Sequence, residues 1–260
     1  MADDNTKSRP RAALITGGGR RIGAAIALAL SRAGYAVALH ANRSRGDAEA
    51  LAARIEKSGG KAAVVVADLA DAKAVGGLIP AAAAFAPLTL LVNNASVFEE
   101  DEIGSLDREN FDATMAINLT APLFLAQAFA AHVARFASVD AGASIVNIVD
   151  QRVLRPTPKF FSYTMSKSAL HAATVTLAQA LAPLRVNAVA PGPVLPSPRQ
   201  TDAQFAAQAA AVPLGRGPSP EDIAAAVVYL AAAASVTGVT LPVDGGQHLS
   251  WRTADSDVAE

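Results

Sequence analysis

The stretch "LITGGGRRIGAAIALAL", Leu14–Leu30, decides the fold class. A short apolar run leads into three glycines and two arginines, and an alanine-rich run follows Gly23. This order predicts a buried strand, a tight turn and a helix N-terminus, which together present backbone N–H groups to a phosphate. Gly17 and Gly19 would permit the turn, and Gly23 would let the helix pack closely on the sheet. The alternative is a glycine turn that binds nothing.

Apolar runs and helical runs alternate along the rest of the chain. Because most of the short runs are continuously apolar, they indicate strands buried on both faces of a parallel sheet. We therefore expect an α/β fold, an open doubly wound sheet in one domain. The predicted strands are 12–16, 36–40, 62–67, 88–94, 144–149, 185–190 and 239–243. The predicted helices are 22–33, 46–58, 71–85, 107–135, 160–182 and 220–234. A mobile stretch is expected at 191–204, which is rich in proline.

The composition excludes several classes of protein. The 260 residues are 52% hydrophobic and 17% charged, which allows a large core. A net charge of −1 argues against a broad nucleic-acid surface, and the absence of cysteine excludes disulfides. The N-terminus is polar, and the apolar stretches Leu78–Val92 and Ala224–Val236 are too short to span a bilayer. We expect a cytoplasmic protein with no membrane or nucleic-acid partner.

The end of the second predicted strand, "HANRSR" (40–45), bears on the choice of nucleotide. Proteins that prefer NAD usually carry an acid here to hold the ribose 2′-hydroxyl. This segment has none, and Arg43 with Ser44 could hold a 2′-phosphate instead. NADP is therefore favoured over NAD, with His40 near its phosphate. The alternative is a basic loop on a solvated surface. The four histidines show no metal-ligand spacing, so no metal is expected.

Tyr163 and Lys167 lie four residues apart in a predicted helix, so their side chains share one face. An ammonium beside a phenol favours the phenolate and lowers its pKa. Tyr163 would then be a usable proton donor near neutral pH. By spacing alone, such a pair is more often part of an ordinary solvated helix face.

The motifs together resemble the short-chain dehydrogenase/reductase family. "TGGGRRIG", "NNAS" (93–96), Asn118 in "INLT", "YTMSK" (163–167), "APGPV" (190–194) and "VTGVTLPVDGG" (236–246) occur in that family's order. The resemblance covers about residues 11–249 and implies a seven-stranded Rossmann-type sheet and hydride transfer with a nicotinamide. It also implies a catalytic acid/base at Tyr163, a lysine at 167 that tunes it, and a water-supporting Asn118.

Two positions depart from the general pattern of that family. Arg21 stands where it usually has glycine, and Asp150 where it usually has a serine thirteen residues before the tyrosine. Both departures resemble the pteridine reductases and dihydromonapterin reductases, which carry TGxxxRxG and a catalytic aspartate. "NNASVF" resembles that branch's segment with a phenylalanine that stacks on the pterin, here Phe98. Arg21 could instead be only a phosphate clamp, Phe98 plain core or a lid, and Asp150 a partner of Arg152 or Arg155.

The resemblance yields a full set of expected site residues. The catalytic set is Asp150, Tyr163, Lys167 and Asn118, and the substrate set is Arg21, Ser96, Phe98, Asp150 and Tyr163. The NADPH set is Thr16, Gly17, Gly19, Arg21, Ile22, Gly23, His40, Asn42, Arg43, Ser44, Asp68, Leu69, Asn94, Ala95, Ser96, Tyr163, Lys167, Pro191, Gly192 and Val194.

The function expected from this set is NADPH-dependent reduction of a pterin such as dihydropterin or dihydrofolate. The alternatives are a reductase of another carbonyl or imine and a non-catalytic NADPH-binding regulator. One domain is expected over 11–249, with polar termini at 1–10 and 250–260. The resemblance also implies a homo-oligomer, expected to be a homotetramer.

Overall fold

The computed structural model describes residues 11–135 and 142–250. Seven parallel strands form one sheet in the order β3-β2-β1-β4-β5-β6-β7. They are β1 (Arg11–Ile15), β2 (Tyr35–Ala41), β3 (Ala62–Val66), β4 (Leu88–Asn93), β5 (Ser144–Ile148), β6 (Arg185–Pro191) and β7 (Thr240–Val243). The order reverses between β1 and β4, which is where open α/β sheets bind ligands at the carboxyl ends of the strands. The predicted doubly wound parallel sheet is confirmed.

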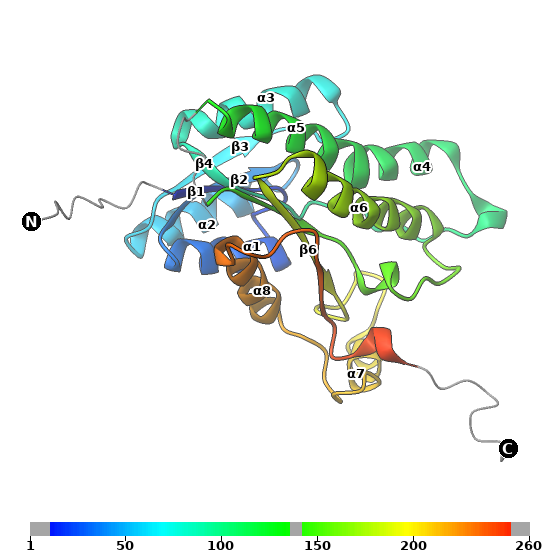
Figure 1. Ribbon diagram of the computed structural model, residues 1–260. Coiled ribbons are helices and arrows are strands. Elements are labelled where there is room, and N and C mark those ends of the chain that lie inside the picture. Colours follow the sequence, from blue (N-terminus) through cyan, green and yellow to red (C-terminus); the bar gives the residue numbers. More distant parts are fainter. Residues whose placement is uncertain (1–10, 136–141, 251–260) are drawn as a thin grey trace, which may run out of the picture.

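Helices cover both faces of this sheet (Figure 1). One face carries α1 (Arg21–Arg32), α2 (Arg45–Lys57) and α8 (Pro220–Ala232). The other carries α3 (Ala72–Phe85), α4 (Arg108–Met115), α5 (Ala121–Val133) and α6 (Phe161–Ala180). Each layer has its own apolar core, as buried parallel strands require.

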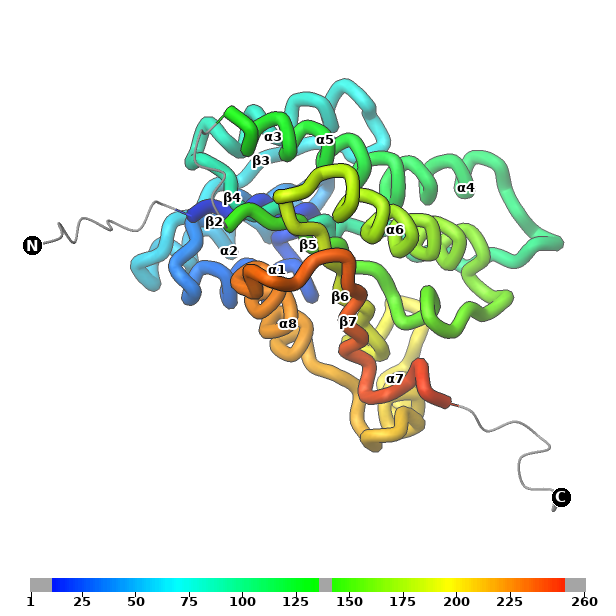
Figure 2. Tube along the Cα trace, viewed as in Figure 1, coloured from blue at the N-terminus to red at the C-terminus, as the bar shows by residue number. Residues whose placement is uncertain are grey.

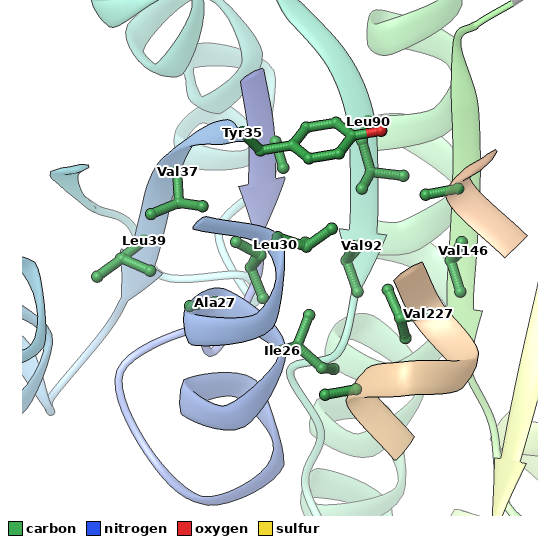
Figure 3. Close-up of a cluster of buried hydrophobic side chains, with 14 of the residues drawn as sticks. Ile26, Ala27, Leu30, Tyr35, Val37, Leu39, Leu90, Val92, Val146 and Val227 are labelled. Atoms are coloured by element: carbon green, nitrogen blue, oxygen red, sulfur yellow. The ribbon is translucent and has the colours of Figure 1, made fainter. Parts of the chain in front are cut away.

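The first and the last long helices of the described chain pack against each other. Figure 3 shows Ile26 and Leu30 of α1 facing Val227 of α8, over Val92 and Val146 of the sheet. All five side chains are fully buried. The carboxyl-terminal quarter of the described chain therefore completes the core that the amino-terminal helix begins.

The predicted helix 107–135 is interrupted. A single π-helical turn, η2 (Ala116–Thr120), separates α4 from α5, and its central residue is Asn118. The π-helical turn changes the helix type but does not end the helix. Arg108–Val133 is therefore one helical run, which by length and composition alone could cross a membrane. Core helices pass the same test, and α5 buries Leu125, Ala126 and Phe129 against the sheet layer.

The sequence did not predict one helix, which begins inside the expected mobile stretch 191–204 and continues past its end. α7 (Asp202–Ala210) begins at a capping box in which Thr201 and Gln204 satisfy each other's backbone N–H groups. Figure 2 shows α7 at the same end of the molecule as the turn after β7, and Leu214 N–H donates to the Gly245 carbonyl at 3.0 Å. Of the predicted polar termini, 1–10 and 250–260, all residues except Ser250 lie outside the described residues.

Candidate active site

A cleft of about 560 Å³ opens at the carboxyl ends of β4, β5 and β6, beside the turn after β1. It brings together many of the residues predicted from the sequence. These are Arg21, Ile22, Asn94, Ser96, Phe98, Asp150, Tyr163, Lys167, Pro191, Gly192 and Val194. Parallel strands end at the same edge of a sheet, which is why side chains so distant in the chain meet here.

The glycine turn after β1 has the geometry of a phosphate cradle. Gly17 has a φ of +61°, which favours glycine. A Cβ on Gly23 would lie 2.1 Å from the Gly17 carbonyl oxygen, and one on Gly19 would lie 2.9 Å from the Ala48 nitrogen. The first N–H groups of α1 have no acceptor within their own helix. The turn therefore needs its glycines and presents backbone donors at its surface.

Thr16 and Asn94 hold this turn in place through hydrogen bonds that join it to the segment that follows β4. The Thr16 hydroxyl accepts the N–H groups of Asn94 and Ala95 at 2.9 and 3.0 Å. The Asn94 side-chain amide donates to the carbonyls of Thr16 and Gly17 at 2.9 and 3.1 Å. These predicted cofactor residues therefore lock the end of β1 to the end of β4.

His40 lies inside the fold. Its Nδ1 accepts the Gly17 N–H at 3.1 Å, and its Nε2 bonds to the Ala67 carbonyl at 3.1 Å. Burial lowers the pKa of this imidazole, and the two bonds require a neutral ring. Both nitrogens are used within the protein, so His40 positions the glycine turn rather than offering its ring to a phosphate.

The loop after β2 presents its basic residues to solvent. Asn42 and Arg43 are exposed, and Ser44 is the half-buried residue preceding α2. Beyond β3, Asp68 is exposed and accepts the Ala70 N–H at 2.9 Å, while Leu69 is buried. These residues lie outside the lining of the cleft, after the carboxyl ends of β2 and β3.

Tyr163 and Asp150 form the centre of the cleft. The Tyr163 hydroxyl donates to Asp150 Oδ2 at 3.0 Å. Asp150 Oδ1 accepts the Arg152 N–H at 2.8 Å, and the Arg152 guanidinium lies 3.7 Å from Oδ2. Asp150 thus contacts both Tyr163 and Arg152.

The expected effect of Lys167 on Tyr163 is wrong in this structure. The pKa of Tyr163 is raised well above its ordinary value, first by burial and then by the Asp150 carboxylate, whose negative charge disfavours a phenolate. Burial also raises the pKa of Asp150, against the opposing effect of Arg152. Both shifts favour a protonated phenol that donates to the Asp150 carboxyl.

Lys167 is buried one turn along α6, as its spacing from Tyr163 predicts. Its Nζ donates to the Ile148 carbonyl at 2.7 Å and lies 5.8 Å from the centre of the Tyr163 ring. Burial lowers its pKa to about 8, and the nearby Asp150 carboxylate partly offsets this. The ammonium thus lines the cleft without bonding to the phenol.

Asn118 occupies the π-helical turn, a feature frequent at functional sites. Its Oδ1 accepts the Val97 N–H at 2.8 Å and the Ser96 hydroxyl at 3.2 Å. Its Nδ2 donates to the Val97 carbonyl at 2.9 Å and to Ser166 Oγ at 3.1 Å. Asn118 is fully buried and ties the segment after β4, which carries Ser96, to α6.

Phe98 stacks on Phe160, with ring centres 4.2 Å apart and planes inclined by 5°. The edge of Tyr163 meets Phe98 at 4.6 Å. The guanidinium groups of Arg152 and Arg199 each lie 5.2–5.6 Å from both phenyl rings. Arg199 also donates to the Phe98 carbonyl at 2.6 Å and pairs with Glu99 at 3.0 Å. Phe98 is therefore part of the cleft wall rather than of the apolar core.

Arg21 is one of two non-glycine residues with positive φ in the described chain, at +51°. A glycine would adopt this backbone at no steric cost, so the arginine is held there in spite of strain. Its guanidinium donates to the carbonyls of Pro196 at 3.0 Å and Leu195 at 3.4 Å. Arg21 thus joins the glycine turn to the loop after β6.

Sequence reasoning missed several residues of the cleft wall. They are Glu100, Ile148, Val149, Gln151, Arg152, Lys159, Phe160, Pro193, Leu195, Ser197, Arg199, Gln200, Gln204, Phe205, Gln208 and Gln247. The residues at 195–208 belong to the loop after β6 and to α7, and no local sequence pattern predicted the course of either segment. Gln151 and Arg152 were adjacent to Asp150, and that adjacency was the available signal. Among the described residues, no three His, Asp or Glu side chains gather as a metal site.

A match to a protein-family model identifies the family of this chain. A family model described as enoyl-(acyl carrier protein) reductase matches residues 18–248. The chain belongs to the short-chain dehydrogenase/reductase family. This short-chain dehydrogenase/reductase is therefore an oxidoreductase, as the resemblance implied.

Its similar proteins include enzymes named for folate and pterin chemistry. FolM alternative dihydrofolate reductase 1 of Brucella canis, crystallised with NADP, is 47% identical with a TM-score of 0.89, over 96% of this chain and 97% of that one. The Brucella suis protein of the same name, also with NADP, is 48% identical with a TM-score of 0.89, over 95% and 98%. Pteridine reductase 1 of Leishmania tarentolae is 36% identical over 92% of this short-chain dehydrogenase/reductase and 96% of that protein.

Proposed function

We propose that this protein is an NADPH-dependent reductase of a pterin, such as a dihydropterin or dihydrofolate. The observation that carries the proposal is the bond between Tyr163 and the buried Asp150 beside the aromatic wall of the cleft. A carboxyl stands where a ketone reductase of this family would carry a hydroxyl, and it can relay a proton through Tyr163 to a ring nitrogen. The names of the Brucella and Leishmania relatives support the same substrate class.

The cleft fits the cofactor. The cradle at Gly17, Gly19 and Gly23 leaves no room for side chains, and its backbone donors suit a pyrophosphate. Exposed Arg43, with Ser44, suits a 2′-phosphate. Bound NADPH supplies a hydride. For the other residues of the predicted NADPH set, from Thr16 to Val194, we propose that each either lines the cofactor site or holds it in shape.

The residues of the chain supply the proton. Hydride addition to a C=N carbon of the ring leaves the adjacent nitrogen to be protonated. The Tyr163 hydroxyl, whose raised pKa keeps it protonated, donates that proton, and Asp150 then takes a proton from water and returns it to Tyr163. The Lys167 ammonium lines the cleft on the Ile148 carbonyl, while Asn118 holds the Ser96 segment in place.

The test is NADPH oxidation measured with dihydrobiopterin, dihydromonapterin, dihydrofolate and a panel of ketones. Turnover of a pterin is the expected result. Asp150→Ser should lower that turnover by about 100-fold, the usual scale for a lost acid–base group. A wild-type enzyme that reduced ketones and no pterin would overturn the proposal, and Asp150→Ser would then preserve or raise the ketone rate.

We also propose a cytoplasmic homotetramer whose working domain spans 11–249. Phe124 of α5 and Met165 and Val175 of α6 are exposed apolar side chains on one helical layer, which supports burial between subunits. Light scattering of the purified protein tests this directly. A monomer at micromolar concentration would contradict it.

A further inference from the structure

Gln151 stands out in the cleft wall because its buried side chain has no hydrogen bond to any residue that the structure describes. The residue is 7% exposed, and its Oε1 is fully buried with no hydrogen-bond partner among the described residues. Its backbone, in contrast, is held firmly. The Gln151 carbonyl accepts the N–H groups of Leu154 and Arg155 at 3.0 and 3.2 Å. A buried amide oxygen without a partner destabilises the folded protein, so its presence calls for a reason.

The neighbours of Gln151 are those that a flat polar substrate would meet. Asp150 precedes it and caps the short turn η3 (Gln151–Val153), while Arg152 follows it and lies over Phe98 and Phe160. Arg152 Nε is also buried without a partner among the described residues. Two consecutive side chains beside the catalytic carboxyl therefore keep unsatisfied polar atoms in the wall of one cleft.

We propose that Gln151 is a substrate-specificity residue, whose amide hydrogen-bonds to the polar edge of the pterin ring. The inference rests on the proposed function. An amide offers a donor and an acceptor side by side, which matches a heterocycle edge that carries both ring nitrogens and exocyclic groups. Because no bond to a described residue fixes the Gln151 amide, a half-turn can present either atom. A simple ketone has only one acceptor, and Tyr163 already serves it.

The experiment compares Gln151→Leu with Gln151→Glu and with a control, Gln179→Leu, on an exposed position of α6. Gln151→Leu should raise the KM for the pterin by about tenfold or more, which is about 1.4 kcal/mol. Its kcat and its Kd for NADPH should change less than twofold. Its Tm should stay equal or rise, because an unpartnered buried amide has been removed. Gln151→Glu keeps an acceptor, so its KM for the pterin should lie between those of the wild type and Gln151→Leu. Gln179→Leu should match the wild type.

Each outcome is decisive. A Gln151→Leu enzyme whose KM stays within twofold of the wild type overturns the inference while leaving the proposed function intact. A loss of Tm together with weaker NADPH binding would assign Gln151 a structural role and would also overturn it. If the wild-type enzyme reduces no pterin, the proposed function fails first, and this inference fails with it.

Discussion

At the scale of single residues, removal of the Tyr163 hydroxyl tests the proposed proton donor while leaving the rest of the cleft in place. Tyr163→Phe deletes the oxygen that bonds to Asp150 and keeps the ring edge that meets Phe98. We expect unchanged NADPH affinity and a turnover lower by about 100-fold or more. Steady-state rates and cofactor titration measure both. Tyr229→Phe, at a 57% exposed position of α8, is the control and should keep full activity.

The second residue-scale prediction concerns the nucleotide. Arg43→Ala should weaken NADPH binding by about 1.5–3 kcal/mol, the scale of a lost charge-assisted contact, and leave NADH binding unchanged. Arg45→Ala is the matched control, since Arg45 is paired with Glu49 at 2.7 Å. Equal loss for both nucleotides, or a wild-type enzyme that uses NADH as well as NADPH, would refute the role given to Arg43.

At the scale of elements, the glycine turn and α1 depend on close backbone packing. Gly23→Ala would place a methyl group 2.1 Å from the Gly17 carbonyl oxygen, so the turn must move. We expect a lower Tm and weaker NADPH binding together. Gly77→Ala, in the interior of α3, is the control, because a Cβ there meets nothing within 4 Å. That change should stabilise the protein by about 0.5–1 kcal/mol. Thermal unfolding and cofactor titration distinguish the two variants.

The elements show what the sequence can predict. Strand and helix positions followed from apolar periodicity and turn residues, within a few residues at each boundary, and Tyr163 and Lys167 followed from helical spacing. α7 did not, because its start depends on a capping box inside a proline-rich loop. The stack of Phe98 on Phe160 and the bond from Arg21 to Pro196 join segments far apart in the chain. The raised pKa of Tyr163 depends on burial, which no local pattern reports.

At the scale of the whole molecule, stability should depend on pH through two histidines whose pKa is lowered by folding, buried His40 and half-buried His132. Burial lowers the pKa of His40 and His132 in the folded state, and each ring accepts a backbone N–H that a protonated nitrogen could not accept. The unfolded chain therefore binds protons more readily. Their contribution to stability is present above about pH 6.5 and is lost as the pH falls below it.

The measurement is Tm between pH 5 and 8. His40→Asn should show a shallower fall below pH 6.5 than the wild type, with the remaining slope due in part to His132. Identical slopes in the two proteins would exclude His40 as a contributor.

The packing of α1 against α8 has a consequence for how the chain is made. Ile26 and Leu30 leave the ribosome early, but Val227, which covers them, is added only after six of the seven strands. A nascent chain can pair β1 with β2 and later with β4 while this apolar face stays open to water. Exposed apolar surface of this kind promotes association with other chains. The growing polypeptide is thus a natural client for chaperones until α8 closes the layer.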